Sequence, residues 1–151
     1  MKLNLHNQDG VNDLIYRVLK LSASAKPRWG SMDATEMLQH CNAANKLLLQ
    51  GIESTRKSSF RQKALKNAFL YLPIKFPRNI KAPKTLKLIA SDKHVKDFEK
   101  EKELYIELIS QLPAHQFPSY LFHPVFGNLN SKQWGVINWM HMDHHLRQFN
   151  V

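Results

Sequence analysis

Apolar side chains recur at every third or fourth position in four segments of the 151-residue chain, which predicts four amphipathic α-helices. The expected helices cover about residues 9–21, 34–51, 92–112 and 130–148. Asp33 with Glu36 has the spacing of a capping box at the start of the second helix, and Asn130 with Gln133 repeats it before the fourth. Gly51 and Pro113 are the expected stops of the second and third helices.

The connections between these helices differ in length, and this difference predicts the topology. The segment between the second and third helices is far longer than a helix hairpin requires. Leu65, Ala68, Phe69 and Leu72 predict a short helix within it, and the prolines after it favour extended chain. Residues 113–129 are expected to form a loop. A long crossover lets the second and third helices run parallel, so we expect an all-α fold: one domain over residues 1–151, a four-helix bundle in up-down-down-up order.

The positive charge is concentrated in one segment. Lys and Arg total 22 against 12 Asp and Glu, a net charge of +10. Residues 54–91 contain no acidic residue but ten basic ones: Arg56, Lys57, Arg61, Lys63, Lys66, Lys75, Arg78, Lys81, Lys84 and Lys87. This segment could supply cations for an anionic substrate, contact nucleic acid or an acidic membrane as a non-enzymatic binding module, or simply aid solubility. Few of its aromatic residues are placed for base stacking, which disfavours nucleic acid.

The remaining composition bounds the setting of the protein. The N-terminal residues lack the apolar run of a signal peptide, and no stretch approaches the length that spans a bilayer. Cys41 is the single cysteine, so no internal disulfide can form, and we expect a cytoplasmic protein. Cys41 falls on the core-facing side of the second helix and is interpreted as a buried core residue rather than a catalytic thiol.

Three of the eight histidines fall within residues 141–145. His141 and His145 are four residues apart, so a helix presents both imidazoles on one face, a frequent platform for divalent metals. Met142 stands where a zinc protease would have its glutamate, which disfavours that class of enzyme. His40 lies near the start of the second helix, which is antiparallel to the fourth in the expected bundle. The three histidines can therefore meet at one end of the molecule and leave open coordination positions, as in catalytic metal sites.

Alternatives for these side chains remain open. His144 could pair with His141 in place of His145, since an i, i+3 spacing is also feasible. Gln148 and Asp143 are candidates to orient the ligands, and Arg147 to hold an anionic substrate group or cap the helix. His40 could equally be a hydrogen-bonded core residue. The other histidines are expected outside the site, with surface roles for three and a structural role at the opposite end of the bundle for the last: His6, His94, His115 and His123.

The motifs around these residues resemble the DinB-like (YfiT-like) metalloenzyme superfamily over nearly the whole chain. The residues that carry the resemblance are Trp29-Gly30-x-Met32, Glu36-Met37-Leu38-Gln39-His40, His123-Pro124-x-Phe126-Gly127-x-Leu129, Trp134 and His141-Met142-Asp143-His144-His145-Leu146-Arg147-Gln148-Phe149. The resemblance implies a four-helix bundle, often dimeric, with a site for zinc, nickel or a similar divalent ion. By position, its ligands would be His40, His141 and His145.

Other branches of this superfamily include S-transferases and isomerases that use a low-molecular-weight thiol as cofactor. Many of those branches have His-Arg-x-Gln after the last ligand, whereas this chain has His145-Leu146-Arg147-Gln148. The resemblance therefore implies a metal-dependent enzyme acting on a small molecule, either a thiol-dependent S-transferase or a hydrolase, and a homodimer. The alternative is the binding module that uses the basic segment 54–91.

Overall fold

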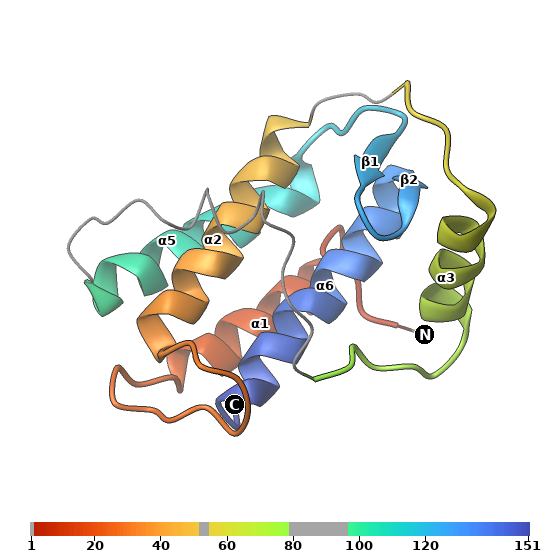
Figure 1. Ribbon diagram of the computed structural model, residues 1–151. Helices are drawn as coiled ribbons and strands as arrows, with labels where there is room; N and C mark the ends of the chain where they lie inside the picture. Colours follow the sequence, from red (N-terminus) through yellow and green to blue (C-terminus); the bar gives the residue numbers. More distant parts are fainter. Residues whose placement is uncertain (1, 52–54, 79–96) are drawn as a thin grey trace.

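The computed structural model describes residues 2–51, 55–78 and 97–151, and most of these residues are helical (Figure 1). The all-α class expected from the sequence is confirmed at this level. In chain order the elements are α1 (Gln8–Leu19), α2 (Ala34–Gln50), α3 (Phe60–Tyr71), α5 (Phe98–Gln111), the short 3-10 helix η1 (Leu112–Ala114), β1 (Leu121–His123), β2 (Gly127–Leu129) and α6 (Ser131–Gln148).

The helix ends follow the local sequence signals. Asp33 and Glu36 exchange both hydrogen bonds of a capping box at the start of α2, and Asn130 and Gln133 do the same for α6. Gly51 ends α2 in the left-handed conformation, with φ of 57°. Helix α5 starts after Asp97, whose side chain accepts a hydrogen bond from the Lys100 amide. Residues 92–96 of the expected third helix lie outside the described residues.

The segment before α6 differs from the expected loop. The chain passes Pro113 in one 3-10 turn and then forms an antiparallel hairpin, in which Leu121 pairs with Leu129 and His123 with Gly127. Gly127 has φ of +69°, and a Cβ there would lie 2.5 Å from Ser58 Oγ, so both conformation and space require glycine. The short helix expected around Leu65, Ala68, Phe69 and Leu72 is α3, which starts at Phe60 after a capping box of Ser59 and Gln62 and ends at Tyr71.

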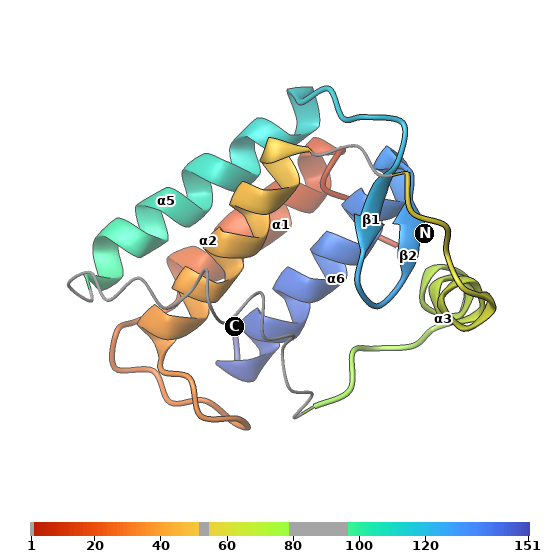
Figure 2. The ribbon, with the colours of Figure 1, turned by 45° about the horizontal axis from the view of Figure 1, so that its top comes forward.

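Two apolar clusters hold these elements together. The larger one lies among α1, α2, α5 and α6, and includes Val11, Leu14, Met37, Tyr105 and Met142. Helix α2 packs most closely against α5, while α1 contacts both α5 and α6 (Figures 1 and 2). The smaller cluster joins α3 and the hairpin to α6 through five buried residues: Phe69, Phe126, Leu129, Ile137 and Met140. Among the residues that the structure describes, no helix is long and apolar enough to cross a membrane.

Helices α2 and α6 face each other through polar side chains and run antiparallel. The Asn138 side-chain amide donates to Asn45 Oδ1 at 2.9 Å, and both residues are buried. His40, which precedes Asn45 on α2, contacts His141, which follows Asn138 on α6. Moving along α2 from His40 to Asn45, the contacts on α6 move backwards from His141 to Asn138. The two helices are therefore antiparallel, and the start of α2 lies beside the end of α6 (Figure 1).

Candidate metal centre

Three imidazoles meet between the first half of α2 and the last turns of α6. His40 Nε2 lies 3.0 Å from His141 Nε2, and His145 Nε2 lies 3.1 Å from the same atom. The possible ligand atoms of the three residues all lie within 4.8 Å of one another. His145 is buried, and the other two are half-buried. The convergence expected from the spacing of these residues is therefore present in the structure.

Two of the three nitrogen separations match those of ligands around a common ion. Two nitrogens bound to zinc at about 2.1 Å are separated by roughly 3.0 Å at a right angle and roughly 3.4 Å at the tetrahedral angle. The observed contacts of 3.0 and 3.1 Å fall at the lower end of this range. A neutral His141 has at most one proton on Nε2, and one proton cannot form good hydrogen bonds with both His40 Nε2 and His145 Nε2. A cation beside His141 Nε2 would satisfy these nitrogens. The third separation, between His40 and His145, is bounded at 4.8 Å, and two nitrogens that bind one ion at about 2.1 Å are at most about 4.2 Å apart. The residues present therefore fit a divalent metal with at most a small rotation of an imidazole.

Gln148 fixes the orientation of His145. Its Oε1 lies 3.0 Å from His145 Nδ1, and because a carbonyl oxygen only accepts, Nδ1 carries the proton. The other ring nitrogen, Nε2, is then unprotonated and faces His141. Gln148 is held in turn by a 2.6 Å hydrogen bond from its Nε2 to the carbonyl oxygen of Trp29. This is the outer hydrogen bond that metal-binding histidines characteristically make.

Gly30 leaves the space that this arrangement needs. Its φ is +78°, and a Cβ at this position would lie 2.7 Å from Gln148 Nε2. The loop before α2 thus approaches the end of α6 closely, and the Arg28 amide also donates to the Gln148 carbonyl at 2.7 Å. The sequence motif Trp29-Gly30 therefore has a structural reason: it positions the residue that orients His145.

Burial keeps the three imidazoles neutral. Burial lowers the pKa of His40, and the nearby His144 lowers it further. The pKa of His141 is far below its ordinary value, through burial and then through His145 and His40. Burial also lowers the pKa of His145 to about 3. Neutral imidazole is the form that binds metals, so the three side chains are available as ligands at neutral pH.

His144 lies outside the cluster. Its ring packs 5.5 Å from the ring of Trp29 and 6.2 Å from that of Phe76, measured between centroids. Burial lowers the pKa of this imidazole, and the nearby Arg147 lowers it further. His145, rather than His144, therefore completes the group with His40 and His141 in the described part of the chain.

Asp143 and Arg147 form an ionic network beside the cluster. Arg147 Nε and Nη2 each lie 2.8 Å from Asp143 Oδ2, and Arg17 Nη1 lies 2.9 Å from Oδ1. Asp143 is therefore engaged with two guanidinium groups, and none of its described contacts orients a cluster histidine, contrary to our sequence-based hypothesis for this residue. Arg17 of α1 is a part of this network that the sequence did not indicate.

The remaining described histidines have other partners. His123 lies on β1, where its Nδ1 accepts hydrogen bonds from the amides of Val125 and Phe126, so it has the predicted structural role. Contrary to the prediction, it does not lie far from the site, because it is close enough to His141 to lower the pKa of that imidazole. His115 is half-buried rather than fully at the surface, and its ring packs 4.5 Å from that of Phe117, measured between centroids. The surface role predicted for His6 is wrong: it is half-buried, and its Nε2 donates to the Ser131 carbonyl at 2.8 Å. His94 lies outside the described residues.

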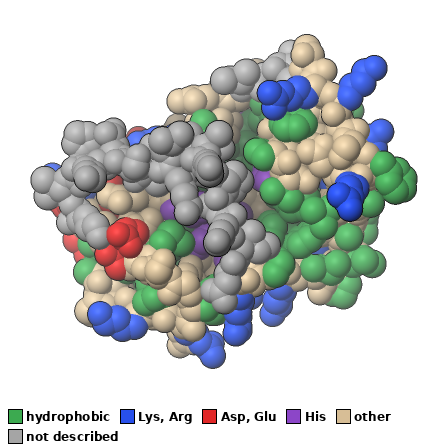
Figure 3. All heavy atoms as spheres, viewed as in Figure 1, with side chains coloured by type: hydrophobic (Ala, Val, Ile, Leu, Met, Phe, Trp, Pro, Cys, Tyr) green, Lys and Arg blue, Asp and Glu red, His purple; other side chains and the backbone are tan. Residues whose placement is uncertain are grey.

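Cys41 is fully buried next to His40 in the sequence but does not join the cluster. Its thiol lies 3.7 Å from the Met37 sulfur, and burial raises its pKa. This agrees with the predicted core role. Histidine side chains are visible on the face of the molecule shown in Figure 3. The cluster is a group of neutral, buried or half-buried imidazoles, and the thiol of Cys41 is not part of it.

The chain belongs to a protein family described as protein of unknown function (DUF1569), whose profile matches residues 1–151. Searches of curated proteins and of solved structures found no match. The family match covers all the motifs discussed above and gives no activity, so the function is argued from the geometry.

Proposed function

We propose that this protein is a divalent-metal-dependent enzyme of the DinB-like type, with zinc or nickel held by His40, His141 and His145. The observation that carries the proposal is the approach of the three imidazole nitrogens, at 3.0 and 3.1 Å around His141. Three nitrogen ligands leave positions open for a substrate or water, which is typical of catalytic sites. A divalent ion there supplies Lewis acidity, which lowers the pKa of a water or thiol ligand.

The chain's own residues have distinct roles in this proposal. Gln148 holds His145 in the tautomer that turns Nε2 toward the ion, and the loop at Trp29 and Gly30 holds Gln148. Burial excludes water from the far side of the imidazoles and keeps them unprotonated. As part of the same proposal, helices α1, α2, α5 and α6 form the up-down-down-up bundle of that superfamily. Their shared apolar cluster and the antiparallel contact of α2 with α6 support this arrangement.

Two chemistries are compatible with the site, and they can be separated by spectroscopy. A thiol-dependent S-transferase binds a thiolate cofactor at the open position, whereas a hydrolase binds water there. The protein is loaded with Co²⁺ and titrated with cysteine, glutathione or bacillithiol. A thiolate-to-cobalt charge-transfer band that saturates supports the S-transferase. A spectrum unaffected by thiols but dependent on pH supports the hydrolase.

A matched pair of variants shows whether either signal comes from this site. His141→Ala removes the central imidazole, while His115→Ala removes a half-buried histidine outside the cluster. We expect the cobalt spectrum to disappear in the first variant and to persist in the second. An unchanged spectrum in His141→Ala would place cobalt elsewhere and contradict the proposal.

A further inference from the structure

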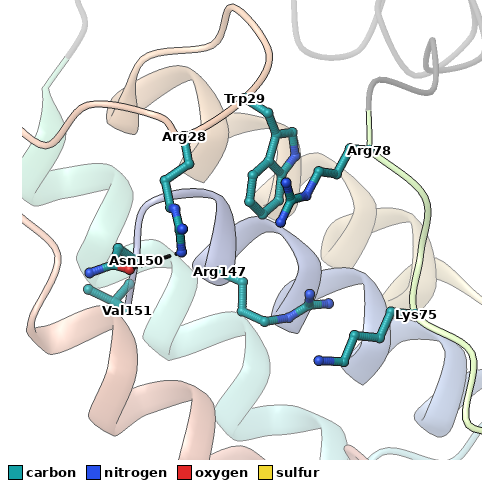
Figure 4. Close-up of a pocket in the computed structure, with 7 residues that line it drawn as sticks. All are labelled: Arg28, Trp29, Lys75, Arg78, Arg147, Asn150 and Val151. Carbon is teal, nitrogen blue, oxygen red and sulfur yellow. Dashed lines mark hydrogen bonds between the residues drawn. The ribbon is translucent and has the colours of Figure 1, made fainter.

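A cavity of about 370 Å³ lies at the end of α6. Figure 4 shows it between the loop before α2, the last residues of the chain and the segment that follows α3. The cavity is lined by seven residues: Arg28, Trp29, Lys75, Arg78, Arg147, Asn150 and Val151. Four of their side chains are basic and none is acidic. This concentration of positive charge in a hollow favours an anionic ligand.

The three arginine side chains of the cavity each contact a neighbouring residue. The Arg78 guanidinium lies 4.4 Å from the centre of the Trp29 ring, a cation–π contact. Arg147 is fixed by its two contacts with Asp143, and Arg28 Nη1 donates to Asn150 Oδ1 at 3.3 Å. Each guanidinium has five N–H donors, so donors remain for a ligand after these contacts. The cavity therefore offers arginines in fixed positions, the arrangement that recognises phosphate and carboxylate groups.

The adjacent carboxylate does not neutralise this charge. Asp143 is the acidic partner of Arg147, but its other oxygen pairs with Arg17, outside the cavity lining. Lys75 and Arg78 are exposed and have no acidic partner among the described residues. The cavity thus retains a net positive charge that an oxyanion can match.

Trp29 adds an unsatisfied donor at the same place. Its indole Nε1 is buried and has no hydrogen-bond partner in the described part of the structure. The other two tryptophans do have partners, since Trp134 donates to the Leu121 carbonyl and Trp139 to the Gly10 carbonyl. Figure 4 shows the Trp29 indole nitrogen on the side of Arg78. A buried donor without an acceptor is unusual in a folded protein, and an anionic ligand would provide an acceptor.

The cavity shares its wall with the metal centre. The Trp29 carbonyl accepts the hydrogen bond from Gln148, which in turn accepts from His145 Nδ1. The Trp29 ring also packs 5.5 Å from the ring of His144, whose own centroid lies 5.2 Å from that of His145. A ligand bound in the cavity would therefore lie close to the histidine cluster, because Trp29 is connected to His145 through Gln148 and through His144.

We propose that this cavity binds an oxyanion group, phosphate or carboxylate, of the small molecule on which the metal centre acts. The inference rests on the proposed function for the role of that molecule as substrate or cofactor. The binding of the oxyanion itself depends only on the cavity. It can therefore be tested in metal-free protein, where failure of the proposed function leaves it intact.

The test is a titration monitored through the indole N–H resonances in ¹H–¹⁵N spectra. Metal-free protein is titrated with inorganic phosphate, malonate or, as a reference, chloride at constant ionic strength. A Trp29→Phe variant assigns the reporting resonance. We expect a saturable shift of the Trp29 resonance with phosphate or malonate, and little change at Trp134 and Trp139. The stronger of the two ligands identifies the group as phosphate or carboxylate.

A pair of charge-matched variants completes the design. Lys75→Gln with Arg78→Gln removes two cations from the cavity, while Arg61→Gln with Lys63→Gln removes two from the exposed side of α3. All four residues are exposed, so both variants should fold. Loss of charged hydrogen bonds should weaken binding about tenfold or more in the cavity variant and leave the control unchanged.

Several results would overturn the inference. These are the absence of a saturable shift with phosphate and malonate, an equal response to chloride, and equal weakening in the two variants. Binding that requires a bound metal would also overturn it, because the anion would then bind the ion instead of the cavity. Persistence of the shift in metal-free His40→Ala protein would support the cavity independently of the metal centre.

Discussion

His145 Nδ1 donates a hydrogen bond to Gln148 Oε1 at 3.0 Å, one turn further along the same helix. This contact fixes which nitrogen of the imidazole is free to bind a metal. It also connects the cluster to the loop before α2, since Gln148 Nε2 donates to the Trp29 carbonyl. The metal centre is therefore supported by a helix end and a loop that are far apart in the sequence.

Replacing Gln148 should weaken metal binding without unfolding the protein. In Gln148→Ala, His145 loses the acceptor for its Nδ1 proton, and its ring is no longer held in one tautomer. Loss of such outer hydrogen bonds typically lowers metal affinity about 10- to 100-fold. Competition titrations with a chelating dye would measure this. Gln111→Ala, at an exposed position of α5, is the control, and equal affinities for the two variants would contradict the assigned role.

Two glycine substitutions distinguish a general loss of stability through backbone strain from a specific effect on metal binding. Gly30 and Gly51 both have positive φ, 78° and 57°, so alanine at either position should cost about 1–2 kcal/mol of stability. Only at Gly30 would the new Cβ approach Gln148. We expect comparable losses of thermal stability in both variants, but reduced zinc affinity in Gly30→Ala alone. Similar zinc affinities in the two variants would show that Gly30 does not support the site.

The buried pair Asn45 and Asn138 should stabilise the contact of α2 with α6. Asn45→Ala leaves the Asn138 amide without its 2.9 Å acceptor, which should cost about 1–3 kcal/mol. Because the residues share one hydrogen bond, the double alanine variant should lose less stability than the two single variants added together. Urea denaturation of the four proteins measures this coupling. Additive effects would mean that the pair does not couple the helices.

The metal-free protein should lose stability as the pH falls below 6.5. The pKa of His145 is lowered to about 3 in the folded state from an ordinary value of 6.5, so between these values the unfolded state binds the additional proton. Stability from this residue is complete above pH 6.5 and declines at about 1.4 kcal/mol per pH unit below it. Urea denaturation across this range should show a shallower decline in His145→Gln. If the free energy of unfolding fell equally steeply with pH in the wild type and in His145→Gln, His145 would not be the source of this pH dependence.

Local signals in the sequence were sufficient to predict much of the architecture. The capping boxes at Asp33 and Asn130 determine where two helices begin, and the four-residue spacing of His141 and His145 places both rings on one face. These two features depend on neighbouring residues, which is why they can be predicted from the chain. The meeting with His40 is a contact between distant residues, and it was predicted from the expected antiparallel packing of the second and fourth helices.

Features that depend on distant contacts were not predictable in the same way. The role of His6 comes from Ser131 at the start of α6, and the network around Asp143 includes Arg17 of α1. The hairpin before α6 was missed because its strands are only three residues long, too short to show a period of two in the sequence. The charge of segment 54–91 indicated an anionic partner, but only the fold shows Lys75 and Arg78 beside Arg28.

The central claim is that His40, His141 and His145 hold one divalent ion. The most direct test is elemental analysis of untagged protein purified without a metal column, compared across His40→Ala, His145→Ala and His115→Ala. The account predicts about one zinc or nickel per chain in the wild type and in the His115 variant, and little in the other two. Equal metal content in all four proteins, or none in the wild type even after incubation with zinc and nickel, would contradict it.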